Sequence, residues 1–153
     1  MTESQQKLFE FLKENYQLLD LSLQHLEFSF QKCKQLNLHG NLSEEEMETL
    51  DAFASRFART SDIFTQKIVI TLLRLLQEDY QTFIDRMNFC EKINAISSAS
   101  DMIEIRALRN AISHEYRQAN LMELYEKILA QQHELNRSIE LSKQYVASMF
   151  PRI

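Results

Sequence analysis

A stretch in the last third of the chain carries the residues best suited to chemistry. Residues 101–117 read DMIEIRALRNAISHEYR. A helix turns by about 100° per residue, so Ile105, Leu108 and Ile112 would share one side of it. The opposite side would gather the polar side chains, namely Arg106, Arg109, Asn110, Ser113, His114 and Arg117. The pattern predicts a helix anchored by apolar residues, with arginines, an amide, a hydroxyl and an imidazole on its other face.

These side chains suit the chemistry of a phosphate ester. Arginine presents a planar fork that matches phosphate oxygens and stays charged, and histidine exchanges protons near neutral pH. Asn110 precedes His114 by four residues, so its amide can orient the ring or contact a ligand. RNA carries its own nucleophile, the 2′-hydroxyl, and its cleavage needs proton transfer and charge stabilisation but no metal. The alternative interpretation is a solvated helix face without a ligand.

The same residues resemble the signature of a known family. Residues 109–116 read RNAISHEY. This is similar to the R-x4-H-x-Y signature of HEPN domains, in the form carried by HepT-type toxins, where Asn usually follows the Arg. All four signature positions match. The resemblance covers about residues 80–117, and the N-terminal half of the chain matches only as generic helix.

The resemblance implies a fold and a catalytic arrangement. HEPN domains are all-α bundles that commonly form homodimers, in which the motif helices of two protomers meet in a cleft. Active members are metal-independent endoribonucleases. By this resemblance Arg109 would hold the phosphate of an RNA substrate, His114 would be the acid–base group and Asn110 would assist the geometry. Phosphate- or RNA-binding roles for Arg106, Ser113 and Arg117 follow from the helical pattern and not from the motif.

The resemblance also implies a partner protein. Members found beside MNT-type nucleotidyltransferases act as the toxin of a toxin–antitoxin pair, and the partner silences them by adding AMP to the motif tyrosine, here Tyr116. We therefore expect an endoribonuclease toxin with such an antitoxin. One alternative is a catalytically silent HEPN subunit that binds a nucleotide or the nucleotidyltransferase. A further alternative, favoured by the composition alone, is a helical protein that only binds other proteins.

The composition predicts which elements must position these residues. The chain has 153 residues with one Gly and one Pro, which excludes glycine-rich phosphate loops and hairpin-rich β folds. We expect a single HEPN-like domain over residues 1–153, built as an antiparallel up-and-down bundle of about five helices. The expected helices cover about residues 2–37, 43–77, 79–95, 101–113 and 120–149, with a bend in the second at 59–62.

Details of the first two helices follow from spacing. The first carries an apolar seam with a seven-residue period, formed by Phe9, Leu12, Tyr16, Leu19, Leu23, Leu26, Phe30 and Cys33. Further apolar residues should widen this seam into a bundle core: Leu8, Phe11, Leu18, Leu21 and Phe28. Gly40 should supply a left-handed helix cap. Ser43 and Glu46 have the spacing of a capping box.

The remaining features predict no cofactor, no metal and no membrane span. The formal net charge is −5, which argues against a broad surface for duplex nucleic acid. Cys33 and Cys90 are interpreted as reduced core thiols. His25, His39 and His133 share no ligand spacing, and Glu44-Glu45-Glu46 is interpreted as charge at a helix start. Arg56 and Arg59, near Asp62, are interpreted as surface or ion-pair residues, with contact to a cleft or a partner as the alternative. Without a signal peptide or an apolar span, a cytoplasmic location is expected.

Overall fold

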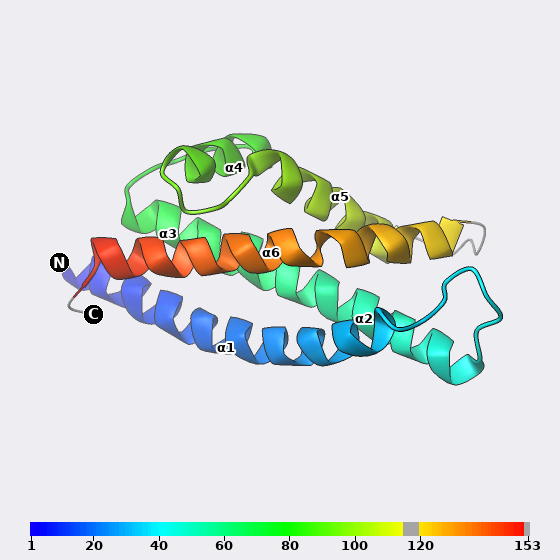
Figure 1. The fold of residues 1–153 in the computed structure, drawn as a ribbon. Helices are drawn as coiled ribbons and strands as arrows, with labels where there is room; N and C mark the ends of the chain where they lie inside the picture. The colour runs from blue at the N-terminus through cyan, green and yellow to red at the C-terminus, as the bar shows by residue number, and fades with distance from the viewer. Residues whose placement is uncertain (115–119, 152–153) are drawn as a thin grey trace.

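The structure is a computed structural model that describes residues 1–114 and 120–151. Its elements are α1 (Glu3–Cys33), α2 (Glu44–Asp62), the π-helix η1 (Ile63–Ile68), α3 (Val69–Leu75), α4 (Phe83–Lys92), α5 (Ala99–His114) and α6 (Leu121–Met149) (Figure 1). The described residues contain no strand. The expectation of an all-α bundle is confirmed, and the second expected helix corresponds to α2, η1 and α3 in succession.

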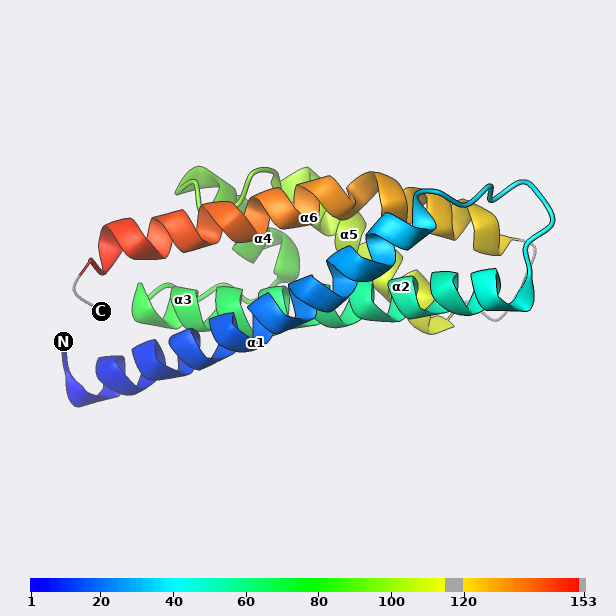
Figure 2. The same cartoon turned by 60° about the horizontal axis from the view of Figure 1, so that its bottom comes forward.

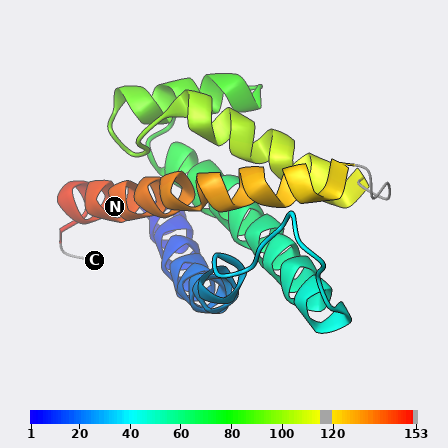
Figure 3. The same ribbon diagram turned by 45° about the vertical axis from the view of Figure 1, so that its right-hand side comes forward.

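These three segments form one continuous rod at the centre of the bundle. Helix α1 packs along the rod and runs in the opposite direction, as Figure 2 shows. Helices α5 and α6 also pack against α2 and against each other. Helix α4 packs on α5, and the two form a pair at the top of Figure 3. The rod therefore positions both α1 and the polar motif helix α5.

The core contains the apolar residues that the periodicity predicts. The fully buried side chains include Leu12, Leu19 and Leu26 of α1, Phe53 and Phe57 of α2, Phe64 of η1, and Tyr125, Ile128 and Leu135 of α6. The contact between α1 and the rod also contains small polar residues. Ser22 and Thr60 lie buried there and share a hydrogen bond of 2.7 Å between their hydroxyl oxygens.

The prediction that further apolar residues of α1 widen the core is wrong for four of the five. The side chains of Phe11, Leu18, Leu21 and Phe28 are 42%, 51%, 50% and 63% exposed, and Leu8 is half-buried. The reason lies in how α1 meets the rod. Its inner face is completed by Asn15, Ser22 and Ser29, which are buried. With these residues inward, the other four lie outside the core.

Two predicted helix boundaries and a predicted cap need correction. Helix α1 ends at Cys33 rather than near residue 37, and α4 begins at Phe83 rather than 79. Gly40 does not adopt a positive φ. Its N–H donates to the carbonyl oxygen of Asn37 at 3.1 Å, in a turn where an added Cβ would lie 3.1 Å from the Asn37 amide nitrogen. Gly40 therefore lies in a turn rather than a left-handed cap, and a Cβ at this position would press on the side chain of Asn37.

The predicted capping box is confirmed. Glu46 N–H donates to Ser43 Oγ at 3.1 Å, and Ser43 N–H donates to Glu46 Oε1 at 2.9 Å. At residues 59–62, where the sequence predicts a bend, the regular helix α2 ends, and the π-helix η1 begins at Ile63. There Thr60 Oγ1 donates to the Arg56 carbonyl at 2.8 Å, and Thr65 Oγ1 donates to the Ser61 carbonyl at 2.9 Å. Such hydroxyl bonds to the preceding turn disturb regular helix geometry.

Both cysteines lie in the core, as expected. Cys33 and Cys90 are fully buried and form no disulfide. Burial raises the pKa of the Cys33 thiol to about 11 and that of Cys90 to about 12. Both thiols are therefore protonated near neutral pH and poor nucleophiles. Among the described residues, no helix combines the length and apolarity that crossing a membrane requires.

Replacing Ile105 by Ala should reveal how firmly α5 is anchored. Ile105 is fully buried, so we expect its truncation to lower the free energy of unfolding by about 2–5 kcal/mol. Ile84→Ala is the matched control because Ile84 is 53% exposed, and its effect should stay within about 0.5 kcal/mol. Urea unfolding followed by circular dichroism measures both. Equal losses in the two variants would contradict this placement of α5.

Candidate functional site

Local hydrogen bonds and apolar contacts fix the position of α5. The Asp101 N–H donates to Ser98 Oγ at 3.1 Å, and the Ala99 N–H donates to Glu91 Oε1 at 3.1 Å, so polar side chains cap the first turn. Further along, Met102, Ile105 and Leu108 are buried in the core. This anchoring directs the opposite side of the helix away from the core, as the spacing of its apolar residues predicts.

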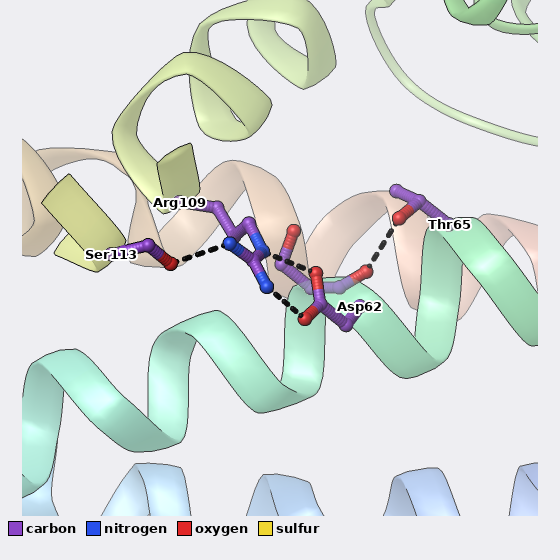
Figure 4. A network of polar contacts seen from close by, with 5 residues as sticks. Asp62, Thr65, Arg109 and Ser113 are labelled. Atoms are coloured by element: carbon purple, nitrogen blue, oxygen red, sulfur yellow. Dashed lines mark hydrogen bonds and ion pairs between the residues drawn. The ribbon is translucent and has the colours of Figure 1, made fainter. Parts of the chain in front are cut away.

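A bidentate ion pair connects this opposite side to the rod. Arg109 donates from Nε to Asp62 Oδ1 at 2.7 Å and from Nη2 to Asp62 Oδ2 at 2.8 Å. Its Nη1 donates to Ser113 Oγ at 2.6 Å, one turn further along α5 (Figure 4). The Arg109 and Asp62 side chains are 32% and 39% exposed, so the pair lies at the edge of the core. Arg109 is thus held in one orientation from both helices.

The ion pair leaves part of the guanidinium available to a ligand. An arginine carries five N–H groups, and the three contacts of Arg109 use one each on Nε, Nη1 and Nη2. One N–H therefore remains on each terminal nitrogen. The hydrogen bond to Asp62 raises the pKa of Arg109 above its ordinary value. Partial burial lowers this pKa, and the negative charge of the Asp62 carboxylate raises it. The group stays fully charged.

A polar cavity opens beside the ion pair. Its volume is about 290 Å³, and its lining residues come from the rod and from α5: Ser61, Asp62, Thr65, Gln66, Arg106, Arg109 and Asn110. The Arg106 guanidinium carbon lies 4.3 Å from the centre of the Phe83 ring, a cation–π contact that holds Arg106 against α4. Two positioned arginines and two amides at one cavity can bind an anionic ester and contact its polar substituents.

The structure brings together some of the predicted site residues and not others. Arg106, Arg109 and Asn110 line the cavity, and Ser113 contacts Arg109. His114 is exposed at the end of α5 and does not line the cavity. The two remaining predicted residues, Arg117 and Tyr116, lie outside the described residues. Within one chain, therefore, the cavity contains the candidate phosphate ligands but not the candidate acid–base group.

Three residues of the site are not predicted by the sequence: Asp62, Thr65 and Gln66. All three come from the end of α2 or from the π-helix, and π-helical turns occur frequently at functional sites. A signal was present in the sequence. The run Arg59-Thr60-Ser61-Asp62 interrupts an otherwise apolar helical face. This run predicts only a bend in the helix, because nothing in the sequence indicates that Asp62 faces Arg109.

The other candidate residues have structural roles or lie elsewhere. Arg56 Nη1 donates to the His25 carbonyl at 3.1 Å and to Ser29 Oγ at 2.6 Å, which ties α2 to α1. His39 Nε2 lies 2.5 Å from Glu126 Oε1 on the exposed surface. His133 is exposed on α6. In the described part of the chain, no group of three or more His, Cys, Asp or Glu side chains is arranged to hold a metal ion.

Comparison with known proteins adds no assignment. No family model, curated protein or solved structure matches this chain. The motif and the geometry of the cavity are therefore the basis for assigning a function.

A double-mutant cycle on Asp62→Asn and Arg109→Gln should measure the coupling within the ion pair. Because both side chains are about one-third exposed, we expect a coupling of about 0.5–1 kcal/mol in the free energy of unfolding. The coupling should fall in about 1 M salt, which screens exposed charges. Urea unfolding of the wild type, both single variants and the double variant gives the value. Additive single effects would show that the pair contributes nothing to stability.

Proposed function

We propose that this chain is a HEPN-type endoribonuclease, acting without a metal as the toxin of a toxin–antitoxin pair in the cytoplasm. The observation that carries the proposal is the arrangement of Arg106, Arg109 and Asn110 around one polar cavity. Two of these belong to the R-N-x3-H-x-Y motif. A positioned, permanently charged arginine is what stabilisation of the phosphorus oxygens requires.

The proposed reaction is attack of a ribose 2′-oxygen on the adjacent phosphorus. A P–O bond forms to the 2′-oxygen and the P–O5′ bond breaks, leaving a 2′,3′-cyclic phosphate and a 5′-hydroxyl. One group removes the proton of the 2′-hydroxyl and another protonates the leaving O5′. The remaining N–H groups of Arg109 bind the phosphorus oxygens as their charge increases. His114 supplies the proton transfers, and Asn110 binds the phosphate or ribose.

This assignment requires two copies of the chain. His114 lies outside the cavity that contains Arg109, and one chain provides one motif histidine. A two-fold axis that brings the motif helices of two protomers face to face would supply a second Arg–His set without any further sequence feature. The histidine of one protomer could then serve the phosphate held by the other. We therefore propose a homodimer with a composite cleft.

One observation favours the alternative of a catalytically silent HEPN subunit. Asp62 occupies the edge of the Arg109 guanidinium formed by Nε and Nη2, and its negative charge weakens attraction for a phosphate. The formal net charge of −5 acts in the same direction for RNA. Such a subunit would bind a nucleotide in this cavity, or it would bind the partner nucleotidyltransferase itself. RNA cleavage by the purified protein distinguishes the two functions.

His114→Ala and Arg109→Ala should each lower the RNA cleavage rate by about 10²-fold or more, because proton transfer and oxyanion stabilisation are each worth that much. Neither residue is in the core, so the helical circular dichroism should be unchanged. Cleavage of a mixed RNA pool by the purified chain, with and without EDTA, is the measurement. EDTA should have no effect.

Two exposed residues of α6 provide matched controls. His133→Ala and Arg137→Ala remove the same side-chain types from another surface, and cleavage should stay within about twofold of wild type. Cleavage that needs Mg²⁺, or that survives the loss of His114, would refute the mechanism. A wild-type chain without any cleavage activity would favour the silent subunit.

Tyr116→Phe should abolish modification by a neighbouring MNT-type nucleotidyltransferase. In the proposed transfer the Tyr116 phenol oxygen attacks the α-phosphorus of ATP, pyrophosphate leaves, and a base of the partner takes the phenol proton. The AMP adduct would place a phosphate and a purine close to the arginines of α5, where it excludes RNA. Mass spectrometry after co-expression should detect AMP on the wild type and on Tyr145→Phe. An active nucleotidyltransferase that leaves the wild type unmodified would rule out this switch.

A further inference from the structure

Helix α1 carries an exposed apolar stripe, which we call the α1 stripe: Phe11, Leu18, Leu21 and Phe28. Between 42% and 63% of each side chain is exposed. At a rise of 1.5 Å per residue the stripe is about 25 Å long. Isolated exposed apolar residues are common, but large ones aligned along one helix are typical of a binding surface. The stripe is therefore expected to bind another apolar surface.

The α1 stripe lies on the same side of the bundle as the polar cavity. Leu18 lines a hollow of about 380 Å³ together with Asp62 and Gln66, and these two residues also line the cavity of Arg109. Phe28 lines another hollow, of about 450 Å³, beside Thr49 and Ala52 of α2. The stripe and the cavity thus belong to one continuous face that runs from α1 across the rod to α5.

We propose that the α1 stripe binds the α1 stripe of a second copy of this chain, with the two helices antiparallel. The supporting observation is the order of residues. Positions 11, 14, 18, 21, 25 and 28 alternate in steps of three and four and read the same from either end. An antiparallel copy therefore places Phe11 opposite the partner's Phe28, and Leu18 opposite the partner's Leu21. Such self-complementarity is the property that a two-fold interface requires.

The charges within the stripe agree with this arrangement. The same symmetry places Glu14 opposite the partner's His25, and both residues are exposed in the single chain. A carboxylate then faces an imidazole twice in the interface. A parallel arrangement would instead place each Glu14 beside the partner's Glu14, with two like charges in contact. Lys7 of one chain would also lie opposite Lys32 of the other, but at the outer ends of the contact, where water and salt screen the repulsion between the two charges.

The two-fold axis of this pairing would also bring the two candidate sites together. For two antiparallel helices that touch along one face, the axis lies between them and perpendicular to both. Each element of the face then stands opposite its own copy, α1 against α1 and α5 against α5. Because the cavity of Arg109 opens on this face, the two motif helices would meet across the axis. This part of the inference rests on the proposed function; the stripe contact does not.

Glutamate substitutions in the stripe test the contact. We expect the wild-type chain to be a dimer at micromolar concentration by size-exclusion chromatography with multi-angle light scattering. Leu21→Glu combined with Phe28→Glu should convert it to a monomer, because four charges would enter the apolar interface. Ile84→Glu is the matched control, since Ile84 is 53% exposed on α4, away from the stripe, and this variant should remain dimeric.

Cysteine cross-linking tests the direction of the two helices. Phe11→Cys and Phe28→Cys are 17 positions apart, about 25 Å along one helix, so a disulfide between them must join two chains. The double variant should form a covalent dimer under mild oxidation, and each single variant should not. The native Cys33 and Cys90 are buried and should not react.

The outcomes separate this inference from the proposed function. A monomeric wild type, a dimer that survives the two glutamates, or cross-linking of Phe11→Cys with itself would overturn the antiparallel stripe contact, whatever the protein does with RNA. A dimer that requires the stripe but does not cleave RNA would leave the contact intact and refute the nuclease. A stripe variant that is monomeric and has lost cleavage supports both.

Discussion

The π-helix in the central rod is the constraint on which the site depends. Thr60 and Thr65 donate hydroxyl hydrogen bonds to carbonyls of the preceding turns, at the point where the regular helix α2 gives way to η1. A π-helical turn contains more residues than an α-helical turn, so it rotates the residues that follow its start relative to those before it. Asp62, the last residue of α2, meets Arg109 of α5, and Thr65 and Gln66 of η1 line the same cavity. The same rod buries Phe57 and Phe64, so the irregular segment is supported by the core.

The ion pair that results has two opposing consequences for ligand binding. It fixes the guanidinium of Arg109 in advance, which removes the cost of ordering a long side chain when a phosphate arrives. It also places a carboxylate close to any incoming anion, which reduces the attraction. Two N–H groups remain available on Arg109, and Arg106 lies at the same cavity. The balance therefore favours a ligand that contacts both arginines over one that must displace Asp62.

Features that depend on local periodicity can be predicted from the sequence, whereas features that depend on packing between distant segments cannot. The seam of α1, the capping box at Ser43 and the polar side of α5 follow from spacing alone. The position of Asp62 does not, because Asp62 and Arg109 are 47 residues apart. The exposed α1 stripe was missed for a related reason. Spacing identifies the apolar arc of α1 but not which part of it the rod covers. In the structure Asn15, Ser22 and Ser29 face the rod, and the stripe residues are left exposed.

In the proposed dimer, the exposed stripe and the polar cavity are parts of one interface, and each supplies what the other lacks for binding RNA. A chain with a net charge of −5 gains little from long-range attraction for RNA, so its affinity must come from positioned groups at short range. One copy has a single Arg109 partly neutralised by Asp62. Two copies facing each other would double the number of donors and enclose the phosphate in a narrower, less hydrated space, where each charge acts more strongly. The apolar contact between the α1 helices would then supply the association energy that the polar site does not.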